Sequence, residues 1–217
     1  MKTSALLGKL YLIPTTMGDC DPMDVLPQTI KRCIDLIDYY VVENDKTARK
    51  SIKEVSPEKK QSELKLFVLN KHTETKEHLD FIKPLLQGHN MGLMSEAGCP
   101  GVADPGAVIV KLAHERGIQV IPLVGPSSIL LAMMASGMNG QSFTFHGYLP
   151  IEKDEKKASF KALERVSFQT LHPETHLCIA ADITLPTEYI KTKKIAAWKK
   201  ETIDLHKRPT IFIIHKM

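Results

Sequence analysis

The chain has 217 residues, of which 43% are hydrophobic and 25% are charged. This length suits one large domain or two small ones, and the composition excludes a disordered chain, because enough apolar side chains are present to form a core. The 29 basic and 25 acidic residues leave a formal net charge of +4, which is too small to identify a nucleic-acid or membrane partner.

The cysteines and the apolar runs indicate the compartment. Cys20, Cys33, Cys99 and Cys178 lie far apart, without a C-x-x-C pair or nearby histidines at metal-ligand spacing, so we expect reduced thiols and no metal. The first residues are too few and too mixed for a signal peptide, and no apolar run approaches the roughly 20 residues that cross a bilayer. These features predict a cytoplasmic protein without a membrane anchor.

The first half of the chain alternates short apolar runs with segments of helical periodicity. Strands are expected at 9–14, 39–43, 64–69, 91–95 and 120–124, and helices at 26–37, 75–86 and 104–116. This alternation predicts an α/β domain built on a largely parallel, doubly wound sheet. Ligands of such sheets bind at the carboxyl ends of the strands.

The second half continues the pattern less regularly. Helices are expected at 127–136, 152–165 and 190–200, and strands at 143–148, 177–181 and 210–214. We therefore predict an N-terminal α/β domain over 1–124 and a C-terminal α/β domain with a mixed sheet over 125–217.

The stretch SEAGCPGVADPG, residues 95–106, concentrates glycines, prolines and carboxylates at the end of a predicted central strand. Glycine lets the backbone approach a ligand closely, and proline stiffens the turns between. Asp104 and Pro105 also suit the start of the next helix, as N-cap and first helical residue. Similar loops, PTTMGD at 14–19 and GPSS at 125–128, follow two other strands, so three such loops at one sheet edge favour a ligand site.

The chain lacks both common phosphate-binding patterns, G-x-G-x-x-G and G-x-x-x-x-G-K-[ST]. Without glycines at a helix N-terminus, the pyrophosphate of NAD or ATP would lack backbone donors. A ligand that contains adenosine but no phosphate remains possible, because small residues and carboxylates suit adenine and ribose.

Four stretches, YLIPTTMGD, SEAGCPGVADPG, VGPSSI and FTFHGYLP, resemble in this order the tetrapyrrole methylase superfamily of S-adenosylmethionine-dependent methyltransferases. Within it they are most similar to the bacterial group that methylates the 2′-oxygen of a cytidine in 16S rRNA. The similarity covers about residues 10–150. It implies two α/β domains with S-adenosyl-L-methionine in the cleft between them, commonly as a homodimer, and it implies RNA of the small ribosomal subunit as the partner in rRNA processing.

The resemblance also implies roles for individual residues. The implied cofactor-binding residues are Ile13, Pro14, Gly18, Ser95, Glu96, Ala97, Gly98, Val102, Ser127, Ser128 and Ala181, and the implied substrate residues are His72 and Lys46. A ribose hydroxyl must lose its proton as the new bond forms, and Glu43, Glu96 and Asp19 are candidate bases at strand ends. Glu43 is the preferred catalytic residue, the alternative being a plain exposed glutamate.

Two motifs depart from the rRNA group and keep other functions open. That group commonly has E-D-T-R where this chain has Glu43-Asn44-Asp45-Lys46, and roughly A-R-E-L-T-K where this chain has AADITL at 180–185. Fewer fixed cations would weaken contacts to RNA phosphates. The alternatives are C-methylation of a tetrapyrrole and a non-catalytic protein that binds S-adenosylmethionine and associates with RNA.

Two further segments are noted. The stretch 167–176 is shorter than in the family, which usually has another strand and helix there. Lys153, Lys156, Lys157 and Lys161 form a basic helical face that either contacts RNA phosphates or is simply solvated.

Overall fold

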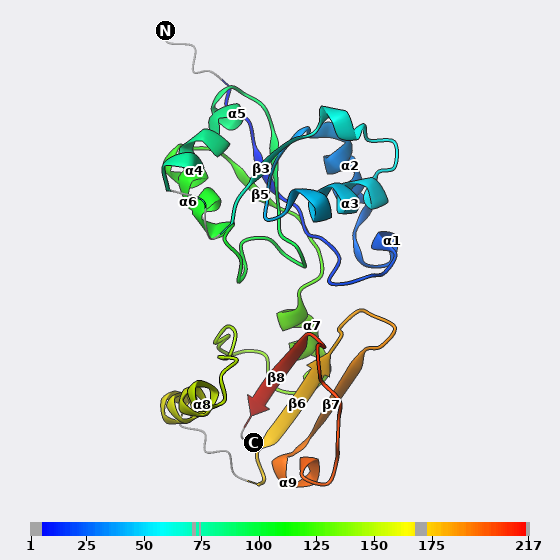
Figure 1. Cartoon of the computed structure of the whole chain (residues 1–217), viewed down its shortest axis with the longest axis vertical. Helices are drawn as coiled ribbons and strands as arrows, with labels where there is room; N and C mark the ends of the chain where they lie inside the picture. The colour runs from blue at the N-terminus through cyan, green and yellow to red at the C-terminus, as the bar shows by residue number, and fades with distance from the viewer. Residues whose placement is uncertain (1–5, 71–72, 74, 168–172, 216–217) are drawn as a thin grey trace. The chain divides into compact units, whose positions relative to one another are not determined.

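The computed structural model describes residues 6–70, 73, 75–167 and 173–215. The chain divides into two compact units, Met1–Ser127 and Ser128–Met217, each of which carries its own sheet (Figure 1). Within the described residues, no helix is long and apolar enough to span a membrane.

The first unit is built on five parallel strands in the order β3-β2-β4-β1-β5. They are β1 (Leu10–Leu12), β2 (Tyr39–Val42), β3 (Lys65–Val68), β4 (Met91–Met94) and β5 (Val120–Pro122). In the central register, Tyr11 of β1 lies opposite Gly92 on one side and Ile121 on the other. The predicted parallel sheet is confirmed, and the carboxyl ends of all five strands lie at one edge.

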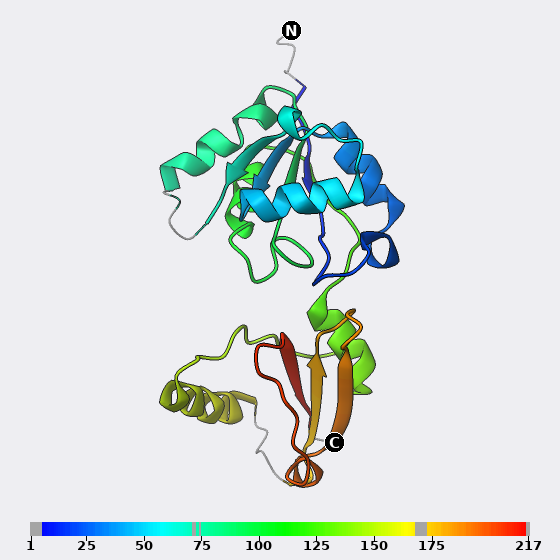
Figure 2. The same cartoon turned by 45° about the vertical axis from the view of Figure 1, so that its right-hand side comes forward.

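Helices cover both faces of this sheet (Figure 2). In chain order they are α1 (Pro22–Val25), α2 (Gln28–Leu36), α3 (Asp45–Val55), the 3-10 turn η1 (Gln61–Glu63), α4 (Thr75–Phe81), α5 (Lys83–Leu86) and α6 (Ala107–Glu115). Helices α2 and α3 pack on one face around Ile30, Tyr40 and Ile52. Helices α4, α5 and α6 pack on the other face around Val41 and Ile109. Because both faces are covered, β2 and β4 are almost wholly apolar.

Two features of these helices differ from the sequence-based expectation. The predicted helix at 75–86 is interrupted at Ile82, because Pro84 lacks an N–H and its ring crowds the preceding turn. Helix α3 was not predicted at all. It begins after Asn44, whose side chain accepts hydrogen bonds from the backbone of Lys46 and Thr47, and it buries a short apolar stripe on an otherwise charged segment.

The second unit holds a three-stranded antiparallel sheet in the order β7-β6-β8. Its elements are α7 (Ser128–Ser136), α8 (Lys153–Ser167), β6 (His176–Ala181), β7 (Tyr189–Lys194), α9 (Ile195–Trp198) and β8 (Thr210–His215). Helix α7 packs on the sheet, and the hydroxyl of Thr192 donates to the carbonyl of Ser136 at 2.8 Å.

Two predicted elements of this unit are wrong. The segment expected as a helix at 190–200 is β7 followed by the single turn α9, because the alternating, β-branched YIKTKK pairs with β6 along its whole length. The strand expected at 143–148 is irregular: Gly147 has φ +74° and Tyr148 is 88% exposed. Without that strand, every described pairing of the second sheet is antiparallel rather than mixed. The segment 167–176 falls partly outside the described residues.

Candidate active site

Three loops meet at the carboxyl edge of the first sheet, because β1 lies between β4 and β5. The backbone N–H of Thr15, after β1, donates to the carbonyl of Gly98, after β4, at 3.0 Å. The Thr15 hydroxyl donates to the Ser95 carbonyl at 3.3 Å, and the Cys99 thiol donates to the carbonyl of Pro126, after β5, at 3.3 Å. The loops that the sequence predicted to share a ligand are therefore linked to one another.

Glycine is required where these loops touch. Gly98 has φ +70°, and a Cβ there would lie 3.2 Å from the Pro126 carbonyl oxygen. A Cβ on Gly125 would lie 2.2 Å from Cβ of Pro14, far inside van der Waals contact. The loops approach one another at backbone distance, which fixes the shape of the lining.

Asp104 closes the glycine-rich loop. Its Oδ2 accepts from the backbone N–H of Gly101 and its Oδ1 from that of Gly106, both at 2.7 Å. Hydrogen bonds to a carboxylate are stronger than neutral ones, so this residue holds the loop between Gly101 and Gly106. The expected N-cap role is corrected: α6 begins at Ala107 with Gly106 before it, and Asp104 lies inside the loop.

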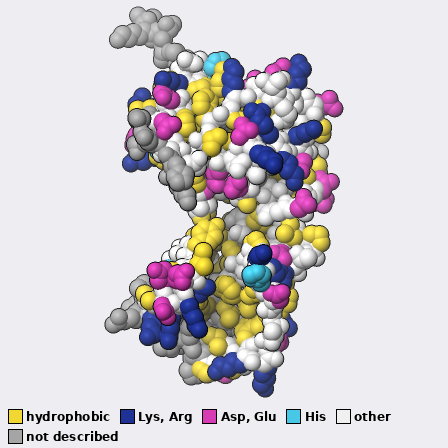
Figure 3. Space-filling view, in the orientation of Figure 1, with side chains coloured by type: hydrophobic (Ala, Val, Ile, Leu, Met, Phe, Trp, Pro, Cys, Tyr) yellow, Lys and Arg dark blue, Asp and Glu magenta, His cyan; other side chains and the backbone are white. Residues whose placement is uncertain are grey.

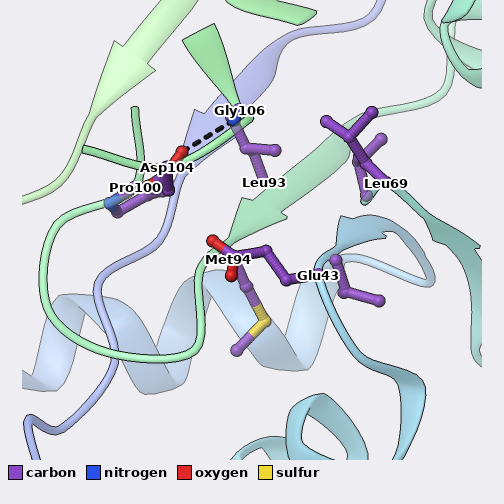
Figure 4. Close-up of a pocket in the computed structure, with 9 residues that line it drawn as sticks. Glu43, Leu69, Leu93, Met94, Pro100, Asp104 and Gly106 are labelled. Atoms are coloured by element: carbon purple, nitrogen blue, oxygen red, sulfur yellow. Dashed lines mark hydrogen bonds between the residues drawn. The ribbon is translucent and has the colours of Figure 1, made fainter. Parts of the chain in front are cut away.

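Glu43 follows β2 and lies at the rim of a small recess of about 170 Å³, including space open to solvent. The recess is lined by Val41, Val42, Glu43, Leu69, Leu93, Met94, Pro100, Asp104 and Gly106. In Figure 4 the Glu43 carboxylate points toward the loop that carries Pro100 and Asp104. Ligand pockets usually measure about 300–1,000 Å³, so this recess is too small to hold a nucleoside.

The electrostatics of the recess make Glu43 more basic than an ordinary glutamate. Burial raises the pKa of Glu43, and the nearby charges of Asp104 and Glu96 raise it further. Glu96 comes from the loop after β4, and its Oε1 accepts from the Thr47 hydroxyl of α3 at 3.4 Å. A carboxylate with a raised pKa is better suited to remove a proton near neutral pH. The arrangement can therefore serve acid–base chemistry.

The structure distributes the predicted residues unevenly. Pro14, Ser95 and Gly98 lie at the contacts between loops, whereas the Ile13 side chain is wholly buried against α2 and α3 and leaves only its backbone for a ligand. Exposed residues on the loops and on α3 are Lys46, Glu96, Ala97 and Val102, with Gly18 half-buried before α1 and Ser127 half-buried at the end of the unit. Ser128 begins α7 and Ala181 ends β6, both in the second unit, and His72 lies outside the described residues.

Sequence reasoning missed several residues that shape these loops. Thr15 and Asn44 make side-chain hydrogen bonds that neither spacing nor composition reveals. In the second unit, Asp182 has φ +51° and accepts from Arg208 Nε at 2.7 Å and from Thr187 Oγ1 at 2.9 Å. The motif at 180–185 lacks its own arginine, and this distant one holds its loop instead; no local signal could have paired them.

The donor chemistry of the lining fits a ligand that contains adenosine and carries no phosphate. The loops offer backbone groups, small residues and the exposed carboxylate of Glu96, and no lysine or arginine lies in the loop 95–106. Within the described part of the chain, no group of three His, Cys, Asp or Glu side chains is placed to hold a metal ion.

Comparisons with known proteins show what the chain is similar to. No family model matches it. It is 26% identical to a protein of Vibrio cholerae named ribosomal RNA small subunit methyltransferase I, over 95% of this chain and 76% of the relative. It is 30% identical to the Bacillus subtilis protein of the same name, over 90% of this chain and 64% of the relative.

A solved structure has the same fold. Uroporphyrin-III C-methyltransferase from Thermus thermophilus, crystallised with S-adenosylhomocysteine, superposes with a TM-score of 0.56 at 15% identity, over 95% of this chain and 97% of that one. At this identity the likeness concerns the fold alone.

Proposed function

Because this chain is a homologue of the proteins named ribosomal RNA small subunit methyltransferase I and has the fold of the tetrapyrrole methylases, we propose that it is an S-adenosylmethionine-dependent rRNA methyltransferase. The similarity to these relatives over 95% and 90% of the chain carries the proposal. The finer assignment is the 2′-oxygen of a ribose in small-subunit rRNA.

The loops after β1, β4 and β5 would hold the cofactor. When bound, S-adenosylmethionine supplies an electrophilic methyl group on a positively charged sulfur. Gly98 and Gly125 let the loop backbones approach closely, and Asp104 keeps the glycine-rich loop in one conformation. Transfer to oxygen is an in-line displacement, so much of the rate comes from this positioning.

Glu43 would accept the proton of the ribose hydroxyl. Its carboxylate follows β2 at the rim of the recess, and burial raises its pKa toward the range in which a base works best. Neighbouring Glu96 and Asp104 strengthen this basicity through their negative charge.

Methyl transfer from labelled S-adenosylmethionine to small ribosomal subunits that lack this modification tests the proposal. We expect label in the RNA at a ribose, and Glu43→Gln should lower kcat while leaving cofactor affinity nearly unchanged. Glu58→Gln, which neutralises an exposed glutamate that lies after α3 and outside the recess, is the matched control for the loss of one carboxylate. Unchanged turnover in Glu43→Gln would refute the catalytic role.

Two other functions are tested in the same experiment. The fold is shared with a uroporphyrin-III C-methyltransferase, so a tetrapyrrole substrate is the second candidate, and label in a supplied uroporphyrinogen rather than in RNA would favour it. A protein that binds S-adenosylmethionine in titration calorimetry and labels neither acceptor would be a non-catalytic relative. Sedimentation equilibrium tests the homodimer, which stays a prediction.

A further inference from the structure

Two consecutive segments of the second unit carry exposed aromatic side chains and then exposed lysines. The irregular stretch between α7 and α8 exposes Phe143 by 47%, Phe145 by 44% and Tyr148 by 88%. Monomeric proteins rarely leave several large apolar groups together on a surface without a binding role. The predicted strand would have covered part of them, but the stretch pairs with no described strand.

The lysines continue this stretch onto α8. Lys153, Lys157 and Lys161 recur every four residues, so they lie on one face of the helix. All three are exposed, and no ion pair to them is found among the described residues. Figure 3 shows Lys and Arg side chains gathered over α8, beside a group of Asp and Glu side chains.

Helix α8 has no extensive contact with another helix or strand in the described part of the chain. Its lysine face is therefore available to a partner. Unpaired lysines attract phosphates, and exposed aromatic rings offer stacking surfaces for unpaired bases. Aromatic side chains are common in protein interfaces, but lysines are depleted there, whereas single-stranded RNA uses both kinds of side chain.

We propose that residues 143–161, comprising the aromatic stretch and the lysine face of α8, bind single-stranded RNA. This rests on the proposed function, because it deepens the substrate class of the same enzyme: the surface would hold RNA flanking the nucleotide that is methylated. Lys153, Lys157 and Lys161 contact phosphates, and Tyr148 stacks on a base. The lysine face of α8 supplies cations that the motif at 180–185 lacks.

Fluorescence anisotropy with a labelled 15-nucleotide oligouridine measures the two contributions separately. Each phosphate contact to a single strand changes the slope of log K against log salt by about 0.7, so replacing the three lysines by glutamine should reduce the slope by about 2 and the affinity at 0.1 M salt by roughly 100-fold. Tyr148→Ala should weaken binding by roughly 5- to 100-fold and leave the slope unchanged.

The matched control replaces Lys199, Lys200 and Lys207, three exposed lysines of the same unit, by glutamine. An equal loss in both triple variants would mean that net charge alone attracts RNA, and it would overturn the proposal. Wild-type slope and affinity in the α8 variant would do so as well.

A Tyr148→Ala variant that loses self-association in sedimentation but keeps RNA affinity would identify the surface as a contact between copies. Loss of binding to vesicles of phosphatidylserine, with oligouridine binding kept, would identify a membrane surface.

The readouts separate this proposal from the proposed function. If the wild-type chain and the α8 triple variant methylate small ribosomal subunits equally well, the proposed function is supported and the proposed RNA surface is overturned. If the wild-type chain binds oligouridine through the α8 lysines but transfers no methyl group, the RNA surface is supported and the proposed function is overturned. Circular dichroism of each variant confirms that the fold is unchanged.

Discussion

Replacing Gly125 by alanine tests whether the contact between the loops after β1 and β5 shapes the cofactor site. The added Cβ would lie 2.2 Å from Cβ and 2.4 Å from Cγ of Pro14, whereas carbon atoms in contact are about 3.5–4.0 Å apart. One loop must therefore move by more than about 1 Å, because Pro14 is buried and its ring cannot rotate away.

The expected cost follows from these distances. Overpacking of this kind destabilises a protein by about 1–3 kcal/mol. A displacement of about 1 Å at a positioned site can lower the rate by about 100-fold. We therefore expect urea unfolding to show a loss of about 1–3 kcal/mol, and calorimetry and methyl transfer to show weaker S-adenosylmethionine binding and lower kcat/KM.

Gly117→Ala is the control, since Gly117 has φ +68° with no atom within 4 Å of the added Cβ. This variant feels only the backbone strain of an alanine at positive φ, about 1–2 kcal/mol, and it should bind the cofactor normally. If Gly125→Ala binds S-adenosylmethionine and turns over as well as Gly117→Ala does, the loop contact does not shape the site.

Four further changes probe the first unit. Because the pKa of Glu43 is raised in the folded state, ionised Glu43 destabilises the fold at neutral pH, and this penalty vanishes below the unfolded pKa of about 4.3. Glu43→Gln should therefore raise the midpoint of thermal unfolding at pH 7 but not at pH 4. Asp104→Asn removes a negative charge that raises that pKa, so the acidic limb of the pH–rate profile should move to lower pH. Asp104→Ala leaves the N–H groups of Gly101 and Gly106 without their acceptors and should lower the free energy of unfolding by about 1–3 kcal/mol in urea. Tyr40→Phe removes a buried hydroxyl that donates to the Ile34 and Ile37 carbonyls and should lower it by about 1 kcal/mol.

The structure of the first unit could be predicted where the spacing of apolar residues alone distinguishes a strand from a helix. Buried runs such as 39–43 and 91–95 are too short and too apolar for a surface helix, so they pair as parallel strands. Helix α3 was missed although its buried Ala48, Ile52 and Val55 recur at helical spacing and Asn44 caps its start, because three apolar residues in a charged segment are a weak signal.

The second unit could be predicted less well because long-range pairing decides it. Residues 190–200 have apolar positions compatible with either a strand or a helix, and β6 selects the strand by pairing with all six residues of β7. The Arg208–Asp182 pair likewise joins residues that no local pattern connects.

In the candidate site, the position of the loops could be predicted from the sequence, but the contacts between their side chains could not. Three glycine- and proline-containing loops after parallel strands must gather at one edge, whatever their side chains do, so sequence alone could predict that these loops meet; that they bind a ligand stays a prediction. The chemistry depends on contacts across the sheet: burial raises the pKa of Glu43, and the loop after β4 raises it further by bringing Asp104 and Glu96 beside the end of β2. Topology therefore places the site, and the charges that the loops carry into it set what the site can do. The same separation explains how one fold serves a tetrapyrrole methylase and the rRNA methyltransferase proposed here, since a change of substrate needs new side chains on the loops and the second unit but no new sheet.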